Sequence, residues 1–107
     1  HDMKLVKEEI FGPVVCAQPF SDENLDKISD SANNTNFGLA ASIWTKNISV
    51  AHKLAAKIRS GTVWVNCHNI FDASLPFGGY KESGWGREMG HEVLKNYTEV
   101  KAVTVNL

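Results

Sequence analysis

The sequence has 107 residues, a formal net charge of −1, 43% hydrophobic residues and 21% charged residues. That length is normally one domain, and this composition excludes an intrinsically disordered chain. The near-zero charge argues against nucleic acid or an anionic membrane surface as the partner. No apolar run reaches the ~18–20 residues needed to span a bilayer. Cys16 and Cys67 are too few cysteines for a disulfide framework, so a reducing, cytoplasmic location is expected.

A strand followed by a helix is predicted near the beginning of the chain. Residues 14–20 are short, apolar and β-branched, which is typical of a strand, and Pro13 fits its start. Ser21 or Asp22 can cap the helix that follows. The apolar positions on one face of this helix are Leu25, Ile28 and Ala32.

A second helix between two further strands is predicted in the middle of the chain. The strands are residues 39–44 and 62–65, and Asn47 can cap the helix between them. Gly61 lies where a left-handed residue commonly ends a helix. The buried stripe of the helix is Ile48, Ala51, Leu54, Ala55 and Ile58. The resulting βαβαβ order predicts an α/β fold with a partial parallel sheet and right-handed crossovers.

The pattern changes after Asn66. Residues 66–86 contain no long periodic segment, and glycines are concentrated there, which predicts a long Gly-rich loop. A short helix is expected over residues 87–95. Residues 97–105 alternate apolar and polar side chains, as a half-buried strand does. Because an unpaired strand edge invites another chain, this segment is predicted to seek a partner strand.

Two glycine-bearing motifs near the ends of the chain resemble the C-terminal part of the NAD(P)-dependent aldehyde dehydrogenase family. They are Glu8-Glu9-Ile10-Phe11-Gly12-Pro13-Val14 and Pro76-Phe77-Gly78-Gly79-Tyr80-Lys81-Glu82-Ser83-Gly84-Trp85-Gly86-Arg87-Glu88. Further blocks that resemble the family, in the expected order, are Asn36-Phe37-Gly38-Leu39-Ala40-Ala41, Ser60-Gly61-Thr62-Val63-Trp64-Val65-Asn66 and Tyr97-Thr98-Glu99-Val100-Lys101.

The resemblance implies that residues 1–107 are a C-terminal fragment of such an enzyme. Residues 9–96 would be the end of the catalytic domain, and residues 97–107 an oligomerisation strand that joins a homodimer or homotetramer. The family oxidises an aldehyde to a carboxylic acid with NAD or NADP, through a thiohemiacetal on a cysteine. Neither Cys16 nor Cys67 matches the nucleophile motif, so the chain alone is expected to be inactive. The alternative is a non-catalytic interaction module.

The resemblance also assigns candidate cofactor and substrate residues. Glu9 and Phe11 match positions that hold the nicotinamide end of the cofactor, and a carboxylate can accept hydrogen bonds from ribose hydroxyls. Phe71 and Phe77 match positions that line the substrate tunnel, and they suit an aromatic or arylalkyl aldehyde such as phenylacetaldehyde. The alternatives are a solvated charge and aromatics that only anchor loops. The cofactor motif and the glycine-dense stretch must then border one common cavity.

Two charged positions near the end of the chain complete the predicted site. Arg87 and Glu99 match an ion-pair network near the subunit interface of the family, and the alternative is a pair of exposed charges. Lys81 resembles a position beside a monovalent-cation site in some relatives, with a plain surface lysine as the alternative. His91 has no second histidine at the spacing of a zinc motif, so no metal site is predicted.

Overall fold

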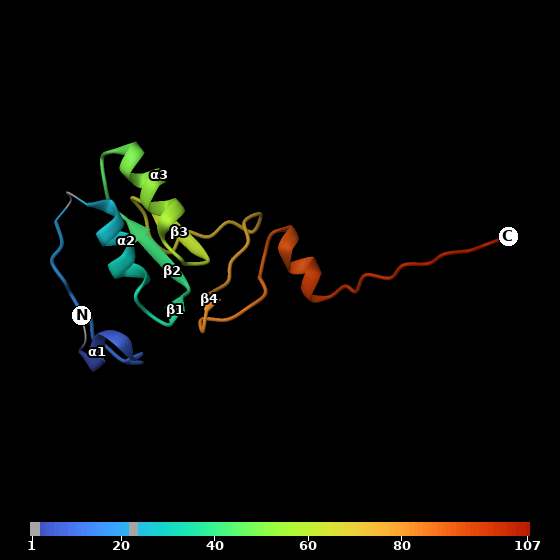
Figure 1. The fold of residues 1–107 in the computed structure, drawn as a ribbon, viewed down its shortest axis with the longest axis horizontal. Coiled ribbons are helices and arrows are strands. Elements are labelled where there is room, and N and C mark those ends of the chain that lie inside the picture. The colour runs from blue at the N-terminus through green and yellow to red at the C-terminus, as the bar shows by residue number, and fades with distance from the viewer. Residues whose placement is uncertain (1–2, 22–23) are drawn as a thin grey trace.

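A parallel βαβ unit forms the centre of the computed structural model, which describes residues 3–21 and 24–107 (Figure 1). Strand β2 (Ala40–Ile43) and strand β3 (Thr62–Val65) pair in parallel, with Ala40 opposite Thr62 and Ile43 opposite Val65. Helix α3 (Ile48–Lys57) is the crossover between them. The predicted strand–helix–strand order is therefore confirmed for the middle of the chain.

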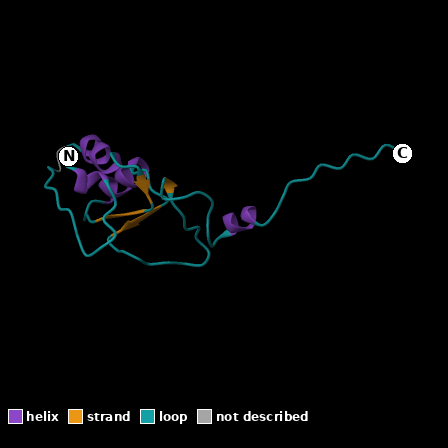
Figure 2. Cartoon of the chain, turned by 90° about the horizontal axis from the view of Figure 1, so that it is seen from below, coloured by secondary structure: helices purple, strands orange, loops and turns teal. Residues whose placement is uncertain are grey.

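Helix α2 (Leu25–Asn33) packs beside α3, and both helices lie on one side of the strands (Figure 2). Each helix begins at an asparagine whose side chain accepts two backbone N–H groups: Asn24 for α2 and Asn47 for α3. Such caps satisfy donors that have no partner within the helix. The cap at Asn47 was predicted. At α2 the expected Ser21 does not cap, and Asp22 lies outside the described residues.

Polar contacts fasten α2 to α3. Lys57 forms an ion pair with Asp26, and the hydrogen bond to this carboxylate is the main cause of the raised Lys57 pKa. The Asn33 side chain donates to the Lys57 carbonyl oxygen (2.9 Å) and accepts from the Arg59 N–H (2.7 Å). Asn33 thus links the end of α2 to the end of α3.

The apolar core is small. Ile43, Ala51 and Leu54 are buried where α3 covers the β2–β3 pair, and Trp64 is buried on the other face of the sheet. Because side chains alternate along a strand, Ile43 and Val65 share one face of the sheet, whereas Ser42 and Trp64 share the other. The sheet therefore presents one face to the helices and the other to the loop that follows β3.

A second, antiparallel pair joins strand β1 (Phe37–Gly38) to strand β4 (Tyr80–Lys81). This contact, which the sequence pattern did not predict, brings the glycine-rich segment back to the start of the βαβ unit. Gly61 makes the return possible, since a Cβ there would lie 1.6 Å from the Gly78 carbonyl oxygen. Gly61 is not among the glycines with positive φ, so the predicted left-handed cap is wrong and close approach is the reason for this glycine.

Two predicted strands are not formed. Residues 14–20 and 97–105 are extended but belong to no strand, and the C-terminal segment projects away from the rest (Figure 1). A strand needs a neighbouring strand for its backbone hydrogen bonds, and neither segment is paired with a strand of the described chain. The βαβαβ order is therefore wrong for its first strand. The helix predicted over residues 87–95 is a 3-10 helix, His91–Asn96, and the remaining helix is α1 (Lys4–Lys7).

Candidate functional site

A row of aromatic rings starts at Trp64 in β3 and runs into the loop beyond it. The Trp64 and Phe71 ring centroids lie 5.6 Å apart, and those of Phe71 and Phe77 lie 5.1 Å apart, both edge to face. Edge-to-face contact is a favoured geometry for aromatic pairs. The structure thus brings Phe71 and Phe77 together, as a shared apolar wall requires, while their contact with a substrate stays a prediction.

Trp64 anchors this row and was not predicted as a site residue. It is only 8% exposed, and its indole N–H donates to the Ile70 carbonyl oxygen at 2.8 Å. A buried tryptophan needs a hydrogen-bond partner for its indole N–H. A tryptophan near the end of a predicted strand, just before an irregular loop, was therefore the sequence signal that could have identified Trp64 as a residue that holds the loop. Trp85, in the glycine-rich segment, is by contrast 98% exposed and makes no ring contact in the described structure.

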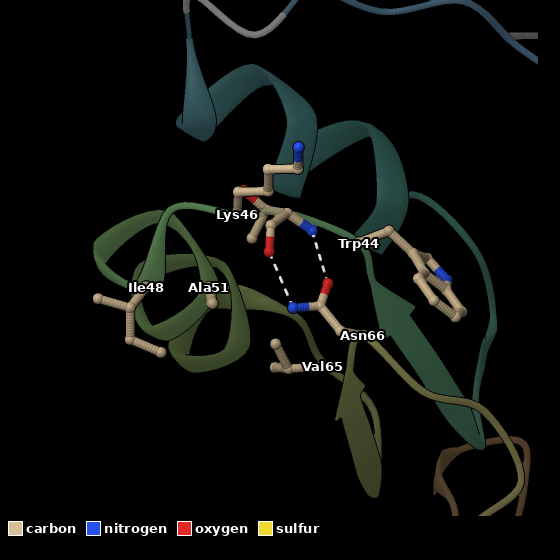
Figure 3. Close-up of a pocket in the computed structure, with 7 residues that line it drawn as sticks. Trp44, Lys46, Ile48, Ala51, Val65 and Asn66 are labelled. Carbon is tan, nitrogen blue, oxygen red and sulfur yellow. Dashed lines mark hydrogen bonds between the residues drawn. The ribbon is translucent and has the colours of Figure 1, made fainter.

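The loops after β2 and β3 are tied together at the carboxyl end of the sheet (Figure 3). The Asn66 side chain accepts the Thr45 N–H and donates to the Thr45 carbonyl oxygen, both at 2.9 Å. Asn66 has a φ of 54°, a left-handed conformation that asparagine tolerates better than most residues. Beside this pair is an open hollow of about 470 Å³, lined by Trp44, Lys46, Ile48, Ala51 and Val65 among others.

A hollow of about 390 Å³ lies where the N-terminal arm meets the glycine-dense stretch. It is bordered by Glu9, by Arg59 after α3 and by Ser83 beyond β4. One residue of each motif, Glu9 and Ser83, therefore borders the same hollow, which is part of the expected arrangement. Phe11 does not line it, and its ring is 97% exposed. A carboxylate at the rim fits a hydroxyl-bearing ligand such as a ribose, but the cofactor roles of Glu9 and Phe11 stay predictions.

Arg87 and Glu99 are not paired within the chain. The described ion pairs are Lys4–Glu8, Lys57–Asp26 and Lys95–Glu92. Arg87 instead donates to the carbonyl oxygens of Gly79 (3.0 Å) and Gly86 (2.5 Å) and lies over the Tyr80 ring at 5.2 Å. These contacts hold the guanidinium against the glycine-rich segment. Glu99 lies in the extended tail and makes none of the described ion pairs. A pairing between subunits stays a prediction.

Lys81 also serves the glycine-rich segment. Its ammonium donates to the carbonyl oxygens of Asn33 (2.7 Å) and Thr35 (2.8 Å), at the carboxyl end of α2. A positive charge is favourable at that end of a helix, where carbonyl groups lack partners. Lys81 is thus more than a plain surface lysine: it holds β4 against the turn after α2.

The two cysteines differ in exposure. Cys16 is exposed, and its thiol donates to the Leu5 carbonyl oxygen at 3.3 Å. Its segment forms no strand that could bury it. Cys67 is half-buried after β3. Within residues 3–21 and 24–107, no cluster of three metal-binding side chains occurs. The same residues contain no helix long and apolar enough to cross a bilayer.

Comparison with known proteins identifies similar chains. The aldehyde dehydrogenase family profile matches residues 1–103. DhaS of Bacillus subtilis (strain 168) is 57% identical over 106 residues, which cover 99% of this chain and 21% of that protein. Retinaldehyde dehydrogenase 3 of Mus musculus is 53% identical over 99% of this chain and 20% of its own length. The chain thus spans about a fifth of the length of these relatives.

A solved structure agrees in fold as well as in sequence. The NAD+ complex of an aldehyde dehydrogenase from Bacillus cereus superposes with a TM-score of 0.89 at 54% identity. The superposition covers 99% of this chain and 21% of that one. Nearly the whole chain, including the arms outside the βαβ unit, therefore has a counterpart within a longer polypeptide.

Proposed function

The chain belongs to the aldehyde dehydrogenase family, and on that premise we propose that it is part of a longer enzyme that oxidises an aldehyde to a carboxylic acid with NAD(P)+. The observation that carries this proposal is the agreement in fold, a TM-score of 0.89 at 54% identity, with an aldehyde dehydrogenase bound to NAD+. Residues 9–96 would complete the catalytic domain and residues 97–107 would serve assembly, in a cytoplasmic enzyme.

The chemistry would divide between this chain and the rest of the enzyme. A cysteine thiolate outside the chain attacks the aldehyde carbon and forms a thiohemiacetal. NAD(P)+, when bound, supplies the hydride acceptor, and water provides the oxygen of the acid. Neither Cys16, whose thiol donates to a carbonyl on an exposed arm, nor the half-buried Cys67 is proposed as the nucleophile. The chain alone is therefore expected to be inactive.

Glu9 and Phe11 would hold the nicotinamide end of the cofactor. Glu9 borders the hollow shared with Ser83 and makes none of the ion pairs of the described residues, so its carboxylate is available to hydroxyl donors. The exposed Phe11 ring offers a flat apolar surface two residues away. Precise positioning matters because hydride transfer requires close and oriented approach of donor and acceptor.

Phe71 and Phe77 would form one wall of the aldehyde site. Their edge-to-face contact leaves Phe71 52% exposed, so ring surface remains for a ligand. Aromatic walls favour apolar aldehydes, and we propose an aromatic or arylalkyl substrate. Similarity alone does not select a substrate, since relatives at 53% and 50% identity are named for retinaldehyde and benzaldehyde.

A role in assembly is the second candidate, favoured by the exposed C-terminal tail. Val100, Val103 and Val105 are 104%, 75% and 73% exposed, which leaves apolar side chains and unpaired backbone without a partner. Pairing with a second copy would satisfy both and would support a homodimer or homotetramer. Sedimentation of the chain with and without residues 97–107 tests this: a monomer in both cases would contradict it.

The cofactor role is tested by following the chain with NMR while NAD+ is added. We expect shift changes at Glu9 and Phe11, weaker in Glu9→Gln, without NADH production from any aldehyde. Glu8→Gln is the matched control, because Glu8 is the neighbouring carboxylate and pairs with Lys4 at 3.6 Å. In the longer enzyme, Glu9→Gln should raise KM for NAD+ and Glu8→Gln should not. Equal effects of the two substitutions would contradict the assignment.

A further inference from the structure

Ser42 and His68 connect β2 to the loop that follows β3. A hydrogen bond of 2.8 Å joins Ser42 Oγ and His68 Nδ1. Ser42 is the register partner of Trp64, so both side chains stand on the same face of the sheet. The His68 ring lies edge-on to Trp64, with centroids 5.2 Å apart. His68 is therefore held by a polar contact to one strand and by a ring contact to the other.

The position of the aromatic row depends on this loop. Phe71 has no polar group of its own, and its ring contacts are Trp64 before it and Phe77 after it. The hydrogen bond from the Trp64 indole to the Ile70 carbonyl fastens the loop just before Phe71. The Ser42–His68 hydrogen bond holds the same loop two residues before Ile70. The two hydrogen bonds therefore lie on either side of Asn69, in the turn that leads to Phe71.

The turn between these two hydrogen bonds contains one residue with left-handed backbone. Asn69 has a φ of 55°, in the left-handed region. A side-chain-bearing residue persists in such a conformation when the surrounding contacts fix it. Removing one fastening leaves Asn69 free to relax toward ordinary backbone angles, and that relaxation would swing Ile70 and Phe71 away from Trp64.

We propose that the Ser42–His68 hydrogen bond is a clip that positions Phe71 and Phe77 and thereby sets the preference of the enzyme for aldehydes that carry an aromatic ring. The inference rests on the proposed function, in which these phenylalanines contact the substrate. Ser42 acts through His68, so it is a positioning residue. The clip affects how the ring of a substrate is held and leaves the reacting aldehyde group alone.

The test compares Ser42→Ala with Ser42→Thr in the longer enzyme that contains this chain. The substrates are phenylacetaldehyde, which has a ring, and acetaldehyde, which has none. Loss of one hydrogen bond should raise KM for phenylacetaldehyde about fivefold in Ser42→Ala. KM for acetaldehyde, and kcat for both, should stay at the wild-type values. Ser42→Thr keeps a hydroxyl and should restore the wild-type ratio of the two KM values.

Two substitutions of His68 separate its hydrogen bond from its ring. His68→Asn places an amide where Nδ1 lies and should behave like the wild type in the KM ratio. His68→Phe keeps a ring against Trp64 but loses the bond to Ser42, and it should behave like Ser42→Ala. Thermal unfolding reports folding in each variant. The indole N–H resonance of Trp64 depends on the bond to Ile70, so it should shift in Ser42→Ala and His68→Phe and stay at its wild-type position in His68→Asn.

The outcomes distinguish this inference from the proposed function. Oxidation of both aldehydes with an unchanged KM ratio in Ser42→Ala, or with an equal rise of both KM values, would overturn the clip. A wild-type enzyme that oxidises neither aldehyde would overturn the proposed function, and the substrate preference with it. If Ser42→Ala fails to fold, His68→Phe against His68→Asn decides the question.

Discussion

The βαβ unit and the two arms that flank it have similar apolar residues but reach different structures. Val63 and Val65 lie in β3, paired with β2, and are half-buried on the face of the sheet that α3 covers. Val14 and Val15 lie in a segment of similar composition and are 53% and 92% exposed. The difference is the neighbour: a strand forms where another backbone lies alongside, and an apolar β-branched run without one stays extended and unpaired.

The accessible surface area shows that much of the whole chain is likewise not packed against a neighbour. Its accessible surface is 9021 Å², against about 5,900 Å² for a compact folded monomer of this mass. Its radius of gyration is 18.1 Å, against about 13 Å for a compact domain of this length. The exposed arms contribute to this excess, and so do exposed side chains of the βαβ unit such as Trp44 and Ile48, each 69% exposed. Substitutions in the packed unit should therefore affect stability, and matched substitutions in the arms should not.

The largest effect is expected where two backbones touch. Gly61→Ala would place a Cβ 1.6 Å from the Gly78 carbonyl oxygen, so one backbone must move, at a cost of about 3 kcal/mol or more. Gly12→Ala, in the N-terminal arm, meets nothing within 4 Å and should change stability by less than about 0.5 kcal/mol. Urea denaturation of both variants checks this. Equal stability of the two would mean that β3 and the glycine-rich segment are not in contact.

The second-largest loss of stability is expected in the core, with a substitution in the tail as the control. Leu54 is 8% exposed against the sheet, and Leu54→Ala should lower the free energy of unfolding by about 2–3 kcal/mol. Val100 is fully exposed, and Val100→Ala should leave it unchanged within about 0.5 kcal/mol. Thermal unfolding measures both. A destabilised Val100→Ala would show that the tail is already packed in solution.

A third, smaller effect concerns the charged residue that braces the glycine-rich segment. Arg87→Ala removes two hydrogen bonds to carbonyl groups and should cost about 2 kcal/mol. Glu99→Gln should cost nothing measurable in the chain by itself. The double substitution tests whether Arg87 pairs with Glu99 within the chain. A coupling energy near zero agrees with the structure, whereas a coupling energy of about 3 kcal/mol would show that the two side chains form an ion pair.

The smallest effect is a pH dependence in the loop between Phe71 and Phe77. The backbone N–H and the hydroxyl of Ser74 donate to the Asp72 carboxylate and hold its pKa below the ordinary 3.8. Because the pKa is lower in the folded state, this contribution is present above about pH 4 and is lost as pH falls through the folded pKa. Carbon NMR titration should find a higher Asp72 pKa in Ser74→Ala. An unchanged pKa would mean that the turn is open in solution.

The elements that the sequence predicted correctly are those specified by their own residues. The stripe on α3 and its Asn47 cap follow from helical spacing and local hydrogen bonding. Strand β3 lies where its β-branched run predicts it. The strand predicted over residues 14–20 failed because its pattern says nothing about which backbone lies beside it. Likewise, the charges of Arg87 and Glu99 did not reveal that Arg87 has carbonyl partners nearer to it.

The sequence by itself determined the family, through motifs found along the whole chain, and it determined the Asn47 cap and the βαβ order at the centre. Only the tertiary structure decided that Phe71 and Phe77 touch, that Glu9 shares a hollow with Ser83, and that Ser42 reaches His68. The physical reason is the separation of the interacting residues along the sequence. Caps and stripes depend on residues a few positions apart, whereas these contacts join segments that the sheet and its turns must first bring together.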